Sequence, residues 1–273
     1  MIWWRRSKSA PKAKSAGPKI VRLPEHIKTV YAIGDVHGCQ GLAQKAEDLI
    51  GADSDCSPDS AAIIYLGDLV DRGPDTAFLL DMMLARKSKE PKRYFIRGNH
   101  EAMMEAFLDA PGDHMNWLDF GGYETLNSYG ILNRLDRLRR MGSKDLTNLL
   151  ATSVTPSHKA FLSDMVDAVD APGFYFCHAG VDPDKPLAEQ ENASLHWARN
   201  RFMAHEGGFE KTIVHGHTPI KAPVHAKGRV SIDTGAYLTN LLTVAKISIE
   251  TSRVEFIVTT SGNEEYEFRK KNW

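Results

Sequence analysis

The sequence predicts an α/β protein with two stacked, mixed β-sheets flanked by helices, and with a helical cap as an insertion in the chain. In the first hundred residues, short apolar runs alternate with segments of helical periodicity, which is typical of strand–helix–strand units. Near the end, two closely spaced apolar runs alternate with polar residues, which indicates a hairpin. Clusters rich in Asp and His follow the apolar runs, and this placement indicates a site at strand ends.

The first part of the chain reads as repeating strand and helix units. We expect strands at 29–33, 61–66 and 93–96, because each is a short apolar run with β-branched or aromatic residues. We expect helices at 42–50 and 76–86, where apolar residues recur at helical spacing. Strands separated by about 30 residues with a helix between them predict parallel pairing.

The second part begins with a helical insertion. Residues 101–172 are mainly helical and polar, so we expect a cap there. Apolar runs then return and predict strands at 173–177, 211–215, 229–233, 241–250 and 253–260. We therefore expect residues 23–273 to form one domain, with the two sheets stacked as a sandwich.

The N-terminal segment differs from the rest in composition. Residues 1–24 carry seven Lys and Arg residues and no acid, whereas the whole chain has a formal net charge of −1, so the remainder is acidic. We expect residues 1–22 to be a disordered basic tail, with Trp3 and Trp4 as its only anchors. Because the charge of the whole chain is close to neutral, we expect neither a nucleic-acid partner nor a membrane partner.

The cysteines and the absence of targeting segments predict a cytoplasmic protein. Cys39, Cys56 and Cys177 form no CxxC pair, which favours a reducing compartment. No apolar run is long enough to span a bilayer, and the first residues lack the apolar core of a secretory signal. We expect a monomer in which Cys39 and Cys177 are small, buried residues with no part in catalysis.

Polar clusters follow five of the predicted strands. The clusters contain Asp35 and His37; Asp68, Asp71 and Arg72; Asn99, His100 and Glu101; His178; and His215 and His217. Five such clusters at successive strand ends predict one shared metal site. Mixed oxygen and imidazole ligands favour Mn, Fe or Zn over Ca or Mg. Six candidate ligands exceed what one ion with an open position needs. We therefore expect two divalent ions, about 3.5–4 Å apart, bridged by Asp68.

The ordered motifs "GDVHG", "GDLVDRG", "GNHE", "HAG" and "GHT" resemble those of PPP-type serine/threonine phosphatases in the calcineurin-like metallophosphoesterase superfamily. The resemblance covers residues 29–245. The segments "WLDFGGYETLNSYG", "HWARNRF" and "SIDTGAY" are similar to bacterial members of this group. The resemblance implies a calcineurin-like sandwich that hydrolyses phosphoserine and phosphothreonine, with a phosphoprotein or phosphopeptide as its partner.

The resemblance also implies a role for each motif residue. One ion would be held by Asp35, His37 and Asp68, and the other by Asp68, Asn99, His178 and His217. His100 would be the general acid, oriented by Asp71, while the phosphate would contact Arg72, Arg199 and Asn99. The implied reaction is direct attack of a metal-bridging hydroxide on phosphorus, with manganese as the first expectation and iron or zinc as alternatives.

We also predict roles for residues near these motifs. Glu101 is expected to support the site by hydrogen bonding, and Asp233 to hydrogen-bond a ligand histidine. His215 lies two residues before His217, so it either reaches the site or has a structural role. The remaining histidines are expected to be structural or on the surface: His26, His114, His158, His196, His205 and His225.

Two other functions remain open. The first is a diadenosine polyphosphate hydrolase, a related group whose members tend to carry Ala in place of Asp71 and "GNHD" in place of "GNHE". This chain departs from that pattern at both places, which favours the phosphomonoesterase. The second is a non-catalytic metal-binding scaffold, which would be expected to lack ligands or His100, yet none is missing.

Overall fold

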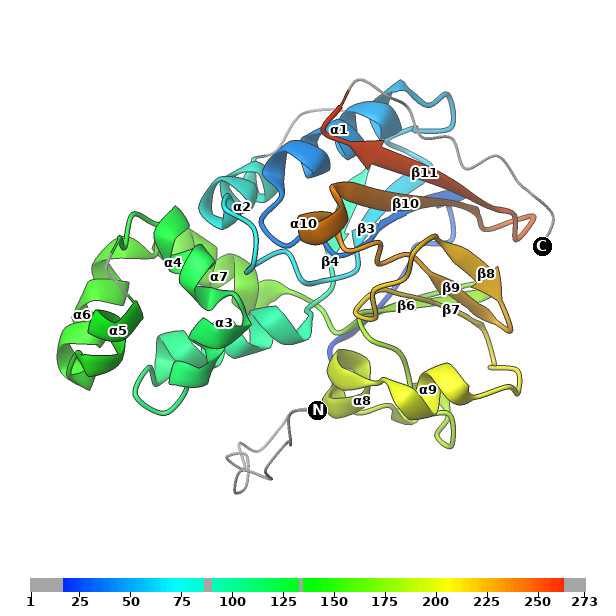
Figure 1. Cartoon of the computed structure of the whole chain (residues 1–273). Helices are drawn as coiled ribbons and strands as arrows, with labels where there is room; N and C mark the ends of the chain where they lie inside the picture. The colour runs from blue at the N-terminus through cyan, green and yellow to red at the C-terminus, as the bar shows by residue number, and fades with distance from the viewer. Residues whose placement is uncertain (1–16, 86–89, 133–134, 263–273) are drawn as a thin grey trace.

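The computed structural model describes residues 17–85, 90–132 and 135–262. Two β-sheets lie face to face in these residues (Figure 1). One has six strands in the order β1-β5-β6-β7-β9-β8, and the other has five in the order β11-β10-β2-β3-β4. Both sheets combine parallel and antiparallel pairs, so the predicted α/β fold with two mixed sheets is confirmed.

The five-stranded sheet contains the predicted strand–helix units. Its elements are β2 (Thr29–Ile33), α1 (Gln40–Ala52), β3 (Ala61–Tyr65), α2 (Thr76–Leu84), β4 (Lys92–Phe95), β10 (Leu241–Ser248) and β11 (Val254–Thr260). Strands β2, β3 and β4 are parallel, whereas β10 and β11 form the predicted antiparallel hairpin. Strand β10 also pairs with β2 in antiparallel register, which joins the hairpin to the first half of the chain.

The six-stranded sheet includes three strands that sequence patterns did not predict. Its strands are β1 (Ile20–Arg22), β5 (Ala168–Ala171), β6 (Phe174–Cys177), β7 (Thr212–His215), β8 (Val224–Ala226) and β9 (Arg229–Ser231). The missed strands β1, β5 and β8 are only three or four residues long. Strands β1 and β8 are also largely exposed, so they carry no strong apolar signal.

Strand β1 corrects the predicted end of the N-terminal tail. Residues Ile20–Arg22 pair in parallel with β5, and the Lys19 backbone N–H donates to Asp167 Oδ2 at 2.7 Å. The boundary predicted at residue 22 is therefore wrong. The remaining tail prediction, including Trp3 and Trp4, concerns residues 1–16 and lies outside the described residues.

The insertion between β4 and β5 is helical. Its elements are α3 (Asn99–Asp109), the 3-10 helix η1 (Met115–Phe120), α4 (Gly122–Ser128), α5 (Leu135–Arg140), α6 (Ser143–Ser153) and α7 (Pro156–Asp164). They form the green lobe beside the sheets (Figure 1). The predicted bounds of 101–172 are shifted, because α3 begins at Asn99 and β5 already belongs to a sheet.

Alternation along the strands divides the apolar residues among several layers. In β2, Val30 and Ala32 enter the core between the sheets, whereas Tyr31 and Ile33 face the core with the residues of α1, α2 and the cap. The outer face of the six-stranded sheet is covered by α8 (Asn192–Trp197) and α9 (Asn200–Ala204), which complete the predicted sandwich. The short elements η2 (Leu187–Glu189) and α10 (Ala236–Thr239) lie in connections.

This layering brings the carboxyl ends of several strands to one edge. The Leu66 N–H donates to Ile33 O at 2.9 Å, and the Ile96 N–H donates to Tyr65 O at 2.9 Å. In the other sheet, the Gly216 N–H donates to His178 O at 2.8 Å. The polar clusters that follow these strands therefore meet. None of the helices in the described residues has the length and apolarity needed to cross a bilayer.

Candidate active site

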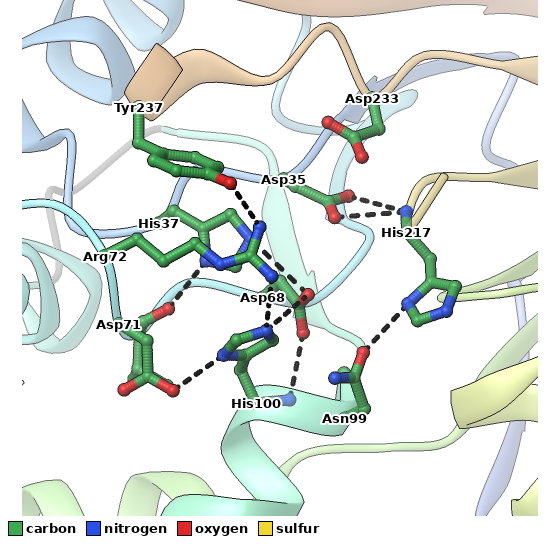
Figure 2. Close-up of polar contacts among 12 residues, drawn as sticks. Asp35, His37, Asp68, Asp71, Arg72, Asn99, His100, His217, Asp233 and Tyr237 are labelled. Atoms are coloured by element: carbon green, nitrogen blue, oxygen red, sulfur yellow. Dashed lines mark hydrogen bonds and ion pairs between the residues drawn. The ribbon is translucent and has the colours of Figure 1, made fainter. Parts of the chain in front are cut away.

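Polar residues from each of the five predicted strand ends lie together in the structure, and Figure 2 shows those that follow β2, β3, β4 and β7. They follow β2, β3 and β4 of one sheet and β6 and β7 of the other. Each of the six predicted metal ligands is buried: Asp35, His37, Asp68, Asn99, His178 and His217. Polar groups removed from water need partners, so their arrangement tests whether a cation fits.

Two histidines have their ring tautomer fixed by the backbone. His37 Nδ1 lies 2.9 Å from Val70 O, and His178 Nδ1 lies 2.9 Å from Leu66 O. A carbonyl oxygen can only accept, so Nδ1 carries the proton in both rings and Nε2 presents a lone pair to the site. Burial lowers the pKa of His37 to about 3 and that of His178 to about 4, which keeps both imidazoles neutral near pH 7.

Asp68 lies between these two lone pairs. Its Oδ2 is 3.5 Å from His37 Nε2, and its Oδ1 is 3.3 Å from His178 Nε2. In each case an acceptor faces an acceptor, which is unfavourable unless a cation lies between them. Among the described residues, two groups could each hold one ion, and both include Asp68: they are His37, Asp68 and His100, and Asp68, His178 and His217. Asp68 thus belongs to both groups, which is compatible with the predicted bridging role.

The negative charge of the site also fits cations. Five buried carboxylates belong to it: Asp35, Asp68, Asp71, Glu101 and Asp233. Burial, followed by the charges of Asp233 and Asp68, raises the pKa of Asp35 well above its ordinary value. Divalent cations among these groups would stabilise the ionised carboxylates. The donor set therefore fits divalent metal ions, as oxygen and imidazole ligands do in general.

The remaining predicted ligands are Asn99, His217 and Asp35. Asn99 Oδ1 lies 2.9 Å from His178 Nε2 and 2.9 Å from His217 Nδ1, so these three side chains meet. Asp35 lies outside both ligand groups, and its two oxygens accept the His217 backbone N–H at 3.1 and 3.0 Å. The structure therefore ties Asp35 to the site through the backbone of His217.

The backbone of the site is strained. Among the described residues, eight other than glycine have a positive φ, and five belong to the predicted site: His37, Asp68, Asp71, Arg72 and His217. Such conformations cost energy and often mark functional positions. Gly98 allows its backbone to lie against Asp68, because a Cβ at this position would lie 2.1 Å from Asp68 Oδ1 and 2.6 Å from Asp68 N.

Glu101 organises the turn that carries Asp68. Its carboxylate accepts four backbone N–H groups at distances of 2.7 to 3.1 Å, from Gly98, Asp68, Leu69 and Val70. The predicted supporting role of Glu101 is therefore seen directly in its contacts. These contacts couple the "GNHE" motif to the "GDLVDRG" turn.

A second group of contacts lies beside the predicted ligands. His100 Nδ1 is 2.7 Å from Asp71 Oδ2, and His100 Nε2 is 3.1 Å from Arg72 Nη2. Burial lowers the pKa of His100, but the carboxylates of Asp68 and Asp71 outweigh burial and raise it above its ordinary value. Arg72 Nη1 also donates to Tyr237 Oη at 2.8 Å (Figure 2).

Two other residues behave differently from their motif neighbours. His215 does not join the site, because its Nε2 lies 2.7 Å from Ser231 Oγ and its ring packs against Phe202. Asp233 accepts the Gly235 N–H at 2.9 Å, and no hydrogen bond joins it to a ligand histidine in the described part of the chain. The interpretation of Asp233 as a partner of a ligand histidine is therefore wrong.

Arg199 occupies a looser position than Arg72. It is exposed and precedes α9, and no hydrogen bond joins its side chain to the described residues of the site. Burial and the neighbouring His178 lower the pKa of His217 to about 3, and the positive charge of Arg199 contributes more weakly to this shift. A phosphate contact by Arg199 stays a prediction.

Sequence reasoning assigned no role to Tyr237, Trp117 and Thr125. Tyr237 contacts Arg72, whereas Trp117 and Thr125 hydrogen-bond the Asp71 carboxylate at 2.7 and 2.8 Å. All three lie in the segments "SIDTGAY" and "WLDFGGYETLNSYG", which the resemblance singled out without explaining them. Their contacts join residues far apart in sequence, so local periodicity carried no signal for them.

The two facing sheets and the buried Asp, His and Asn residues at their shared edge define a metallophosphoesterase. Residues 28–259 match the family model described as "Calcineurin-like phosphoesterase", and the chain belongs to this family.

The curated relatives include enzymes named for different substrates. A relative in Bacillus cereus, "Bis(5'-nucleosyl)-tetraphosphatase PrpE [asymmetrical]", is 24% identical over 77% of this chain and 87% of its own length. "Serine/threonine-protein phosphatase 1" of Salmonella typhimurium is 26% identical over 80% of this chain and 91% of its own length. The family is thus clear, whereas the names of these relatives divide between two substrate classes.

Solved structures share the fold at lower identity. A putative diadenosine tetraphosphatase has a TM-score of 0.60 and 17% identity, and the match covers 90% of this chain and all of the other. A cold-active protein-tyrosine phosphatase of a Shewanella species has a TM-score of 0.53 and 15% identity, covering 92% of this chain and 85% of the other. At these identities the similarity shows the fold alone.

Proposed function

We propose that the chain is a metal-dependent phosphomonoesterase that hydrolyses phosphoserine and phosphothreonine in proteins or peptides. The observation that carries the proposal is the His100–Asp71 pair, in which Nδ1 and Oδ2 lie 2.7 Å apart. Both side chains are almost fully buried beside Asp68. A histidine held in this way can donate a proton from its other ring nitrogen to a leaving group.

The surroundings of His100 favour an acid over a metal ligand. Its Nε2 lies 3.1 Å from the Arg72 guanidinium and 3.8 Å from Asp68 Oδ2. A cation bound to Nε2 would lie against the positive charge of Arg72, which disfavours such binding. The guanidinium can only donate, so Nε2 accepts in this contact; once Arg72 turns to the phosphate and His100 is protonated, the Nε2 proton can be donated to an oxygen of the substrate. This distinction separates His100 from His37, although both lie within one possible ligand group.

The chemistry of the leaving group favours a monoester. A serine or threonine alkoxide is strongly basic and needs a proton as the bond to phosphorus breaks. A polyphosphate leaving group is far less basic, so a dedicated acid helps it less. A buried Asp–His pair is therefore better matched to an alkyl ester of phosphate.

The remaining residues would bind the ions and the phosphate. We assign one ion to Asp35, His37 and Asp68, the other to Asp68, Asn99, His178 and His217, and propose manganese for both. When bound, two such ions supply an activated water and neutralise phosphate charge. Arg72 is half-buried at the site, and with Arg199 it would hold the phosphate oxygens.

A second candidate is hydrolysis of a dinucleoside polyphosphate. It is favoured by the names of the Bacillus cereus relative and of the structurally similar putative diadenosine tetraphosphatase. The same ligands and the same arginines would serve that reaction. The two candidates differ in how much the reaction gains from His100, which makes substrate preference the decisive measurement.

We predict that kcat/KM for a phosphoserine or phosphothreonine peptide exceeds that for diadenosine tetraphosphate by at least about tenfold, which corresponds to about 1.4 kcal/mol. The physical reason is the greater need of an alkoxide for the proton from His100. The measurement is side-by-side kinetics at one pH with one manganese concentration.

A matched variant sharpens this comparison. His100→Asn should lower the rate on the phosphopeptide far more than the rate on diadenosine tetraphosphate. A wild-type ratio at or below one would contradict the phosphomonoesterase proposal and support the dinucleotide hydrolase.

A further inference from the structure

One segment of the cap reaches the catalytic side of the sheets. Thr125 Oγ1 donates to Asp71 Oδ1 at 2.8 Å and accepts the Asp71 N–H at 2.9 Å. Trp117 Nε1 donates to Asp71 Oδ2 at 2.7 Å, and Gly121 O accepts the Arg72 N–H at 3.2 Å. We call Trp117, Gly121 and Thr125 the cap clamp. It makes four hydrogen bonds to the dipeptide Asp71–Arg72.

The dipeptide needs such support because both of its residues are left-handed. Asp71 has a φ of 74° and Arg72 a φ of 68°, and residues other than glycine rarely adopt this backbone conformation. Two consecutive residues in this region persist only when their surroundings hold them. Apart from His100, the partners of the Asp71 carboxylate in the described chain belong to the cap clamp. The orientation of Asp71 is thus set by the cap.

The glycine pair in "WLDFGGYETLNSYG" allows this contact. A Cβ on Gly121, whose φ is 107°, would lie 2.5 Å from Arg72 N. A Cβ on Gly122 would lie 2.4 Å from the ring of Trp117. Both distances are shorter than van der Waals contact, so the pair lets the cap backbone approach Arg72 while the indole packs beneath it. Trp117 also packs against Phe107 of α3, with ring centroids 4.8 Å apart.

We infer that Trp117 and Thr125 are positioning residues that orient Asp71 and, through it, His100 toward the leaving group. The inference rests on the proposed role of His100 as general acid. Trp117 N–H and His100 Nδ1 share one oxygen, Asp71 Oδ2, while Thr125 holds the other. Removal of either cap donor frees the carboxylate to rotate, and His100 then loses its fixed direction. The cap thereby acts on the chemistry without touching the substrate.

The test uses two phosphate esters that differ in leaving group. A phosphoserine peptide has a basic alkoxide leaving group, whereas p-nitrophenyl phosphate has an activated one that needs little acid catalysis. Trp117→Phe removes the indole N–H and keeps an aromatic ring. We expect the ratio of kcat/KM for the peptide to kcat/KM for the aryl ester to fall at least about fivefold. A decrease of this size is consistent with the loss of one hydrogen bond to a charged group.

Matched variants separate positioning from stability. Thr125→Val should lower the same ratio, whereas Thr125→Ser keeps the hydroxyl and should restore it. Tyr129→Phe removes a cap hydrogen bond to His158 Nδ1 (2.7 Å) that does not involve Asp71, so it should leave the ratio unchanged. A purely structural effect would lower both rates in the same proportion and would overturn the inference.

A second readout does not depend on activity. The proton between His100 Nδ1 and Asp71 Oδ2 can be followed by NMR with a diamagnetic divalent ion bound. We expect its resonance to shift in Trp117→Phe and to stay in place in Tyr129→Phe. An unchanged resonance in Trp117→Phe would overturn the inference whichever substrate the chain hydrolyses. Absence of monoester hydrolysis by the wild type would instead overturn the proposed function.

Discussion

Replacing His100 by asparagine is expected to lower kcat on a phosphoserine peptide by about 10² to 10⁴, the usual contribution of general acid catalysis. The physical reason is that His100→Asn removes the ring nitrogen that faces the site and leaves the buried ligands in place. Metal content, measured by elemental analysis, should therefore equal that of the wild type.

The control for this prediction is a second buried histidine with an aspartate partner. His158 lies in the cap, and its Nε2 is 3.0 Å from Asp81 Oδ1, away from the predicted ligands. His158→Asn should change stability without a comparable loss of kcat in the folded protein. Loss of metal in proportion to the rate of His100→Asn would instead show that His100 is a ligand.

Asp68→Asn is expected to remove both ions and to lower kcat by at least about 10³, since a Lewis-acidic ion supplies several kcal/mol to the transition state. The reason is the central position of Asp68, whose two oxygens face His37 and His178. The change removes the shared negative charge with little change in shape. Elemental analysis and kcat on p-nitrophenyl phosphate measure the two effects.

A buried aspartate outside the site provides the comparison. Asp167 Oδ1 lies 2.8 Å from His196 Nε2, so Asp167→Asn also disrupts a buried Asp–His pair. It should retain both ions and the catalytic rate of the folded fraction. If Asp68→Asn lost one ion and kept the other tightly bound, Asp68 would be a ligand of one position only.

The sequence was sufficient for the fold and for most of the site because both depend on local patterns. Strand β3 is a run of buried apolar residues, and Asp68 follows where the run ends. The motif around Asn99 follows β4 in the same way. Parallel strands carry their ends to a common edge, so the meeting of these residues follows from topology.

The features that sequence reasoning missed depend on contacts between distant segments. Strand β1 is only three residues long and is defined by its pairing with β5, nearly 150 positions later. The contact of Trp117 with Asp71 joins the cap to a turn 46 residues earlier. His215 was ambiguous because strand β7 ends at His215, whereas His217 lies beyond the strand with a φ of 63°, so strand alternation does not relate the two side chains.

The metal dependence of hydrolysis tests the central claim most directly. The wild-type protein is first treated with a chelator until elemental analysis finds almost no metal, and is then titrated with Mn²⁺ while p-nitrophenyl phosphate hydrolysis is measured. The structure predicts that the chelated protein is inactive and that activity returns as two ions bind to each chain. Full activity in the chelated protein, with metal content near zero, would contradict a metal-dependent site formed by Asp68, His37 and His178.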